Sequence, residues 1–181
     1  MNTTNKNYFQ FTFLLAVCLL VRFIPLRAPN VEPILATLMP ISRVYGAFLA
    51  FSFAVLSILL YDVISGTLGV QTFFTVSSYG LLGLWSASYF RKRKGGPSDY
   101  VSFAIIGTLL FDALTGLTVG PLFFGQSFSA SLIGQIPFTL LHLVGNIAFA
   151  VILSPAIYNF MVKKKEPSIL SATRILNPKI I

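Results

Sequence analysis

The chain ends two of its long apolar runs with one pattern: Leu60-Tyr61-Asp62-Val63-Ile64-Ser65-Gly66-Thr67-Leu68-Gly69 and Leu110-Phe111-Asp112-Ala113-Leu114-Thr115-Gly116-Leu117-Thr118-Val119-Gly120. Each copy joins an aromatic residue, an aspartate, a hydroxyl residue and a glycine. An aspartate beside bilayer hydrocarbon costs about 3 kcal/mol or more unless it faces water, a partner or a ligand. The glycine lets the helix stop and the chain turn back. The repeat therefore predicts two membrane helices whose ends come together around Asp62 and Asp112.

Composition indicates that the whole chain belongs to a membrane. Of its 181 residues, 55% are hydrophobic and 10% are charged, whereas soluble domains carry about 25% charged residues. A membrane helix needs about 20 residues, so the length suits about five or six helices. We predict an all-α integral membrane protein, with one transmembrane domain over residues 1–162. That domain is expected to be a compact bundle of about six helices, followed by a basic, polar cytoplasmic tail over residues 163–181.

The net charge of +8 does not indicate nucleic acid. Its basic residues gather in Arg91–Lys94 and Lys163–Lys165, each directly after an apolar run. This is the positive-inside pattern of cytoplasmic membrane flanks. We expect a multi-pass protein of the plasma membrane. If it has six helices, both basic clusters, Lys6 and both termini lie in the cytoplasm. Five helices would place Lys6 outside and stay an alternative, but either count leaves Asp62 and Asp112 on the outer side.

The apolar runs set the expected helices. Pro40 and Arg43 predict a short second helix and then a turn, with one kinked helix as the alternative. The last run is too long for one straight crossing, and Pro137 and Pro155 predict kinks in it. Residues 118–127 are expected to form a loop. The expected segments are Tyr8–Pro25, Ile34–Ile41, Tyr45–Ile64, Thr72–Phe90, Tyr100–Leu114 and Ser131–Val162.

Small residues recur at helical spacing on two of these segments. Gly46, Ala50 and Ala54 share one face of the third, and Gly83 and Ala87 share one face of the fourth. Small side chains let membrane helices approach closely. These faces predict tight packing, either within the bundle or against another subunit.

The sequence carries no catalytic signature. It has no glycine-rich phosphate loop, its acidic residues are scattered, and no pair of histidines or of glutamate and histidine has metal-ligand spacing. Nothing resembles the nucleophile elbow of a hydrolase. The single cysteine, Cys18, excludes an intrachain disulfide. We therefore expect no enzyme activity, no metal and no cofactor.

Polar side chains instead gather toward the outer membrane face. His142 and Asn146 lie one helical turn apart and so share a face, along which Gln135 also lies. A structural alternative stays open, in which the aspartates are helix ends held by neighbouring hydroxyls and the His142 face bonds other helices. Arg22 is interpreted as a residue that extends toward the membrane surface. The predicted substrate-binding set is Asn30, Glu32, Asp62, Gln71, Asp112, Gln126, His142 and Asn146.

The order of these features resembles the substrate-binding (S) components of energy-coupling factor transporters. The resemblance covers about residues 8–162 and rests on four stretches: Pro29-Asn30-Val31-Glu32-Pro33, the Gly46 helix ending in Leu60-Tyr61-Asp62, the basic hairpin Arg91–Lys94, and Ile136–Asn146. It implies a six-helix protein that captures a vitamin or other micronutrient from outside. A separate membrane coupling subunit and two ATPase subunits would then drive release into the cytoplasm.

Two positions depart from patterns in that family. Ala16 is followed one turn later by Leu20, where many members carry a second alanine for docking the coupling subunit. The chain begins Met1-Asn2 rather than with the Met-His of nickel and cobalt members, so the resemblance does not extend to metal uptake. The acidic excess in the predicted set favours a neutral or cationic ligand. The alternative hypothesis is a non-transporting membrane protein whose small-residue faces assemble a larger complex.

Overall fold

A computed structural model describes residues 3–25 and 31–162 of the chain. Within those residues the secondary structure is entirely helical, which confirms the predicted all-α class. The predicted site residue Asn30 and the predicted tail, 163–181, lie outside the described residues. The helices are α1 (Thr3–Arg22), α2 (Ile34–Tyr45), α3 (Ala47–Ser65), α4 (Val70–Arg91), α5 (Pro97–Gly116), α6 (Val119–Phe123) and α7 (Phe128–Val162).

Three helical stretches are long and apolar enough to cross a membrane. They are Ala47–Ser65, Pro97–Phe123 and Phe128–Val162. The helices α1 and α4 have 20 and 22 residues but are less apolar, and the apolar α2 has only 12. Large apolar side chains cover the outside, with Val144 69% and Ile152 73% exposed. These stretches indicate a multi-pass membrane protein.

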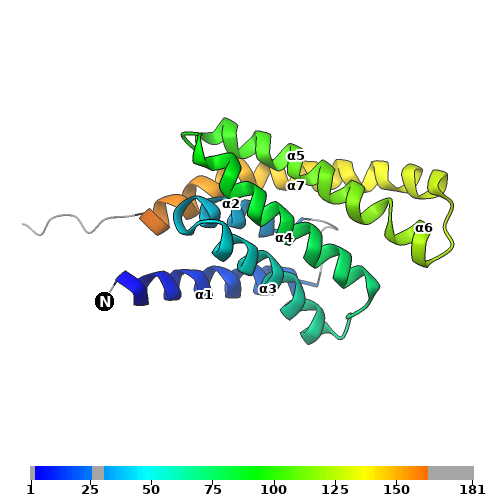
Figure 1. Cartoon of the computed structure of the whole chain (residues 1–181), viewed down its shortest axis with the longest axis horizontal. Helices are drawn as coiled ribbons and strands as arrows, with labels where there is room; N and C mark the ends of the chain where they lie inside the picture. The colour runs from blue at the N-terminus through cyan, green and yellow to red at the C-terminus, as the bar shows by residue number, and fades with distance from the viewer. Residues whose placement is uncertain (1–2, 26–30, 163–181) are drawn as a thin grey trace, which may run out of the picture.

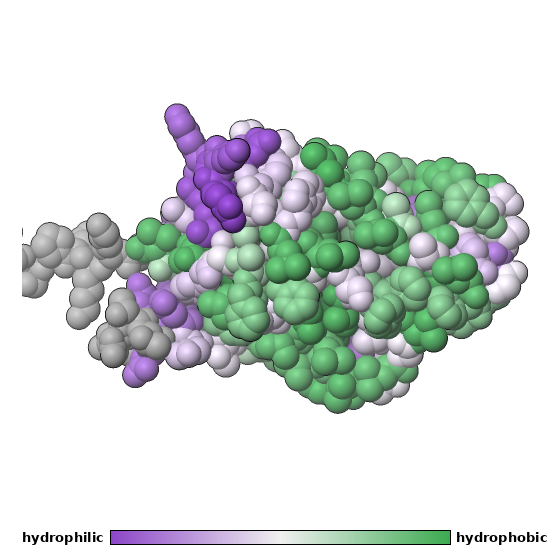
Figure 2. All heavy atoms as spheres, viewed as in Figure 1, coloured by the Kyte–Doolittle hydropathy of each residue, from purple (hydrophilic) through white to green (hydrophobic). Residues whose placement is uncertain are grey.

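Successive long helices run in alternating directions along the molecule (Figure 1). The start of α1, the turn between α4 and α5 and the end of α7 therefore lie at one end. Hydrophilic side chains gather at that end, over the α4–α5 turn, while apolar side chains cover much of the remaining visible surface (Figure 2). The turn from α3 to α4 and the short α6 lie at the opposite end.

The short helix α2 forms the centre of the bundle. Its residues Ile34–Ser42 are all buried, and it packs against α3, α4 and α7. Ser42 Oγ lies 2.6 Å from Ser86 Oγ of α4 within this contact. With 12 residues, α2 is shorter than a membrane crossing, which is why the sequence identifies it only as a short apolar run.

Proline does not end α2, so the predicted boundary at Ile41 is wrong. Pro40 lacks the N–H that would bond the carbonyl of Ala36 one turn earlier. The hydroxyl of Ser154, on α7, donates to that carbonyl instead, at 2.8 Å. The helix therefore continues to Tyr45, and the chain turns at Gly46, whose φ of +86° favours glycine.

The helix α7 covers 35 residues with Pro137 and Pro155 inside it, and the kinks expected at these two prolines stay predictions. One further expectation about a segment is corrected. The predicted loop over 118–127 contains the five-residue helix α6, and Gln126 N–H closes that turn on the carbonyl of Gly120 at 3.2 Å.

The middle of the small-residue faces packs inside the bundle. A Cβ added to Gly83 of α4 would lie 2.9 Å from the carbonyl carbon and oxygen of Ala50 on α3. Ala50 and Ala54 are fully buried. Helix α3 therefore rests directly on α4 at Ala50 and Gly83, whereas Gly46 and Ala87 are half-buried and line a hollow of about 230 Å³.

Candidate functional site

A polar cavity of about 370 Å³ lies between α1, α4, α5 and α7. Three predicted site residues, Glu32, Gln71 and His142, line it. The aromatic rings of Phe111 and Phe138 form apolar parts of its wall. The cavity therefore combines hydrogen-bonding groups with flat apolar surface, as small-molecule sites do. Its lining is Arg22, Glu32, Gln71, Thr75, Phe111, Thr115, Gly116, Val119, Gln135, Phe138 and His142.

His142, on the cavity wall, forms a buried pair with Asp112, which does not line the cavity. His142 Nδ1 lies 2.8 Å from Asp112 Oδ1, and the two side chains are 3% and 2% exposed. When the carboxylate accepts the Nδ1 proton, the neutral imidazole keeps an acceptor at Nε2. Neither Nε2 nor Asp112 Oδ2 has a hydrogen-bond partner among the described residues. Buried polar atoms without partners are rare in folded proteins, so a ligand group that reached either atom would satisfy its missing hydrogen bond.

Asn146 lies one turn deeper on the same seam between α5 and α7. Its Nδ2 donates to Thr108 Oγ1 at 2.8 Å, and both residues are buried. It does not line the cavity. The contact matches the structural alternative of a hydrogen bond between helices.

Arg22 is the residue that the sequence interpretation missed. Its Nη1 lies 3.1 Å from Glu32 Oε2, and its guanidinium carbon lies 4.1 Å from the centre of the Tyr61 ring. Tyr79 Oη donates to Glu32 Oε1 at 2.8 Å. Arg22 therefore lines the site, a role that its interpretation as a residue extending toward the membrane surface did not include. The available signal was that Arg22 is the one charge within its long apolar run.

Asp62 is held by its own turn. Thr72 Oγ1 donates to Asp62 Oδ2 at 2.6 Å, and Thr67 Oγ1 lies 3.4 Å from Oδ1. Gly66, with φ +68°, ends the helix as the repeat predicts. The two aspartates of the repeat thus have different surroundings, because Asp62 lies outside the cavity and Asp112 pairs with His142.

Gln126 also lies outside the cavity. It is exposed, and its amide lies against Gly120. Of the seven described residues in the predicted set, three line the cavity and Asp112 supports one of them.

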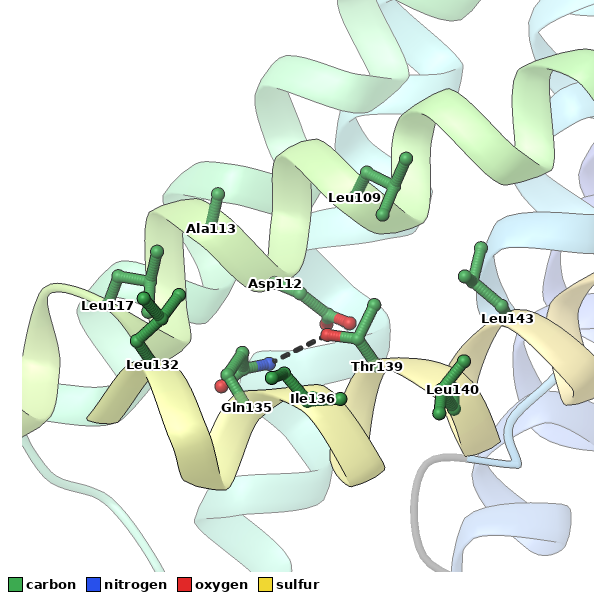
Figure 3. A pocket seen from close by; sticks show the side chains of 10 residues that line it. All are labelled: Leu109, Asp112, Ala113, Leu117, Leu132, Gln135, Ile136, Thr139, Leu140 and Leu143. Carbon is green, nitrogen blue, oxygen red and sulfur yellow. Dashed lines mark hydrogen bonds between the residues drawn. The ribbon is translucent and has the colours of Figure 1, made fainter. Parts of the chain in front are cut away.

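A second hollow lies on the other side of the Asp112–His142 pair, between α5 and α7 (Figure 3). It measures about 330 Å³. Most of its lining residues are apolar, and its polar lining residues are Asp112, Gln135 and Thr139. Gln135 Nε2 donates to Thr139 Oγ1 at 3.2 Å. We call this hollow the α5–α7 groove. Gln135 lines both the groove and the polar cavity.

The charges around the polar cavity are paired. Arg22 faces Glu32, and Asp112 faces His142, so the wall has no large excess of either sign. Such a wall suits a small molecule that is neutral or carries both charges. Comparisons with protein-family models, curated proteins and solved structures found no match to this chain.

Proposed function

We propose that the chain is the substrate-capture subunit of a micronutrient uptake transporter. The observation that carries this proposal is the polar cavity, because it combines aromatic rings, amides and a buried histidine with an unpartnered ring nitrogen. Its size falls within the range of small-molecule sites. The proposed ligand is vitamin-sized, and neutral or zwitterionic.

The placement of charge supports capture from outside. The basic turn Arg91–Lys94 lies at the same end of the molecule as the start of α1, and the α3–α4 turn lies at the other end (Figure 1). By the positive-inside rule, the basic end is cytoplasmic. In this proposal the alternating helices cross the plasma membrane six times, and both termini lie on its cytoplasmic side.

The chain is proposed to bind and not to power transport. Its sequence has no phosphate-binding loop, so energy has to come from other subunits. The proposed partners are a membrane coupling subunit and ATPase subunits, as the resemblance to S components implies. The proposal includes no enzyme activity of the chain itself.

The alternative of a non-transporting assembly protein has less support. It rested on small-residue faces as docking surfaces, and Ala50, Ala54 and Gly83 of those faces are used for packing within the chain. A stable complex that contains no small molecule would favour this alternative.

Thermal stabilisation by a panel of vitamins and related metabolites tests the proposal. Thr75→Phe places a ring in the cavity from α4, and Ser77→Phe adds the same ring at an exposed position outside it. A true ligand should stabilise the wild type and Ser77→Phe but not Thr75→Phe. Equal stabilisation of all three proteins would contradict the assignment of this cavity.

A further inference from the structure

The wall between the polar cavity and the α5–α7 groove is thin. Gln135 lines both spaces, and the Asp112–His142 pair lies between them, with Asp112 lining the groove and His142 lining the cavity. Figure 3 shows Gln135, Asp112 and Thr139 pointing toward one another between the two helices. The two spaces are therefore separated only by the side chains that line them.

The groove opens on the membrane-facing side of the bundle. Leu109, Leu132 and Leu140, which line it, are 47%, 45% and 59% exposed. Large apolar side chains that are half exposed on a membrane helix face lipid. An aliphatic chain can thus reach the groove directly from the bilayer.

Gln135 makes few polar contacts within the described chain. Its side chain is half-buried, and its one hydrogen bond in the described chain is the 3.2 Å contact with Thr139 of the same helix. The amide lies against Gly116, where an added Cβ would overlap it. Gly116 therefore gives the amide its space beside the cavity, and rotation away from Thr139 would join the two spaces.

We propose that the polar cavity takes an amphiphile whose polar head lies beside His142 and whose apolar arm lies in the α5–α7 groove. Gln135 is the gate through which such a molecule enters from the bilayer. The inference rests on the proposed function only in that the cavity is a ligand site. It adds a class of substrate, namely small molecules with a hydrogen-bonding head and an aliphatic arm.

The rate at which a cysteine in the cavity is labelled tests whether molecules enter from the bilayer. Thr115→Cys, in a Cys18→Ala background, places a thiol on the cavity wall while Gln135 stays intact. The probes are N-dodecylmaleimide, which has a polar ring and an alkyl arm, N-methylmaleimide, which lacks the arm, and a charged, membrane-impermeant thiosulfonate. Val144→Cys, at a position that is 69% exposed and outside both spaces, measures the effect of partitioning into the bilayer.

Groove-blocking variants supply the decisive comparison. Ala113→Trp and Leu140→Trp each fill the groove, from α5 and α7 respectively, and Leu114→Trp adds the same ring outside it. We expect the dodecyl reagent to label the Thr115→Cys thiol faster than the methyl reagent does. This advantage should disappear in either blocked variant, but not in Leu114→Trp. Gln135→Ala should raise the dodecyl rate, and the charged thiosulfonate should react equally in all of them.

An unchanged dodecyl rate at the Thr115→Cys thiol in both blocked variants would overturn the inference. That result would leave the proposed function intact, because the charged reagent would still report an aqueous cavity. Failure of the proposed function would instead appear in the metabolite panel, as the absence of any ligand that stabilises the protein, whatever the labelling shows.

Discussion

His142 Nδ1 lies 2.8 Å from Asp112 Oδ1, and this contact joins α7 to α5 inside the bundle. Both side chains are almost fully buried, so each depends on the other for compensation of its lost hydration. The pair also fixes which ring nitrogen of His142 is left for the polar cavity. One contact thus serves both packing and the geometry of the site.

Removing one member of the pair should therefore lower the free energy of unfolding much more than replacing both members with apolar residues. Asp112→Ala removes the partner of a buried histidine and should lower the free energy of unfolding by about 3 kcal/mol. Replacing both residues by leucine should recover much of that loss, because no unpaired polar group remains. Unfolding followed by Trp85 fluorescence measures both effects. A single variant as stable as the wild type would contradict the pairing.

Asp62 should matter for stability but not for ligand binding. Its carboxylate accepts from Thr72 Oγ1 at 2.6 Å and lies outside the cavity. Asp62→Ala should lower the free energy of unfolding by about 1–2 kcal/mol, through the unpaired Thr72 hydroxyl. Ligand affinity, measured by isothermal titration with any metabolite the panel identifies, should stay at the wild-type value. A large loss of affinity in a folded variant would return Asp62 to the site.

The hydrogen bond from Ser154 to the carbonyl of Ala36 lets α2 continue past Pro40, and a double mutant tests this role. Ser154→Ala leaves the carbonyl of Ala36 without its donor and should cost about 1–3 kcal/mol. Pro40→Ala restores a backbone N–H that can bond the same carbonyl. The double variant should therefore be more stable than Ser154→Ala alone, as measured by thermal unfolding in one detergent. Additive losses would show that the hydroxyl does not substitute for the missing backbone donor.

Substitutions at two glycines should differ in their effect on stability, because Gly83 packs against α3 and Gly134 has no neighbour within 4 Å. Gly83→Val has to push α3 away from α4, because its Cβ meets the Ala50 backbone, and should cost about 1–3 kcal/mol. Gly134→Ala meets nothing within 4 Å and should be neutral or stabilising by up to about 1 kcal/mol. Thermal unfolding of the two variants compares them directly. Equal losses at both positions would contradict the close approach of α3 and α4.

The local chemistry of the sequence predicted much of the fold. Apolar runs and the glycine of the repeat placed the helices, and Gly66 ends α3 as expected. The polar face of the last helix led to His142 and Asn146, which both bond α5. Hydropathy and turn chemistry act within a few residues, so they are visible in one sequence.

The remaining features depend on contacts between distant segments. Pro40 is accommodated only because Ser154, far along the chain, lies beside Ala36. Arg22 pairs with Glu32 across the first loop, and no local pattern distinguishes that pairing from extension toward the membrane surface. Asp62 and Asp112 share a local pattern but have different neighbours, so the repeat could not show which of them supports the cavity.

A small molecule held in the polar cavity is the central expectation for this protein. Native mass spectrometry of the detergent-purified protein, with denaturing extraction, measures its presence directly. We expect a stoichiometric polar metabolite in the wild type and in Ser77→Phe, and its loss in Thr75→Phe. A wild type that is empty under gentle purification and unstabilised by the metabolite panel would contradict this expectation, as would equal retention in Thr75→Phe.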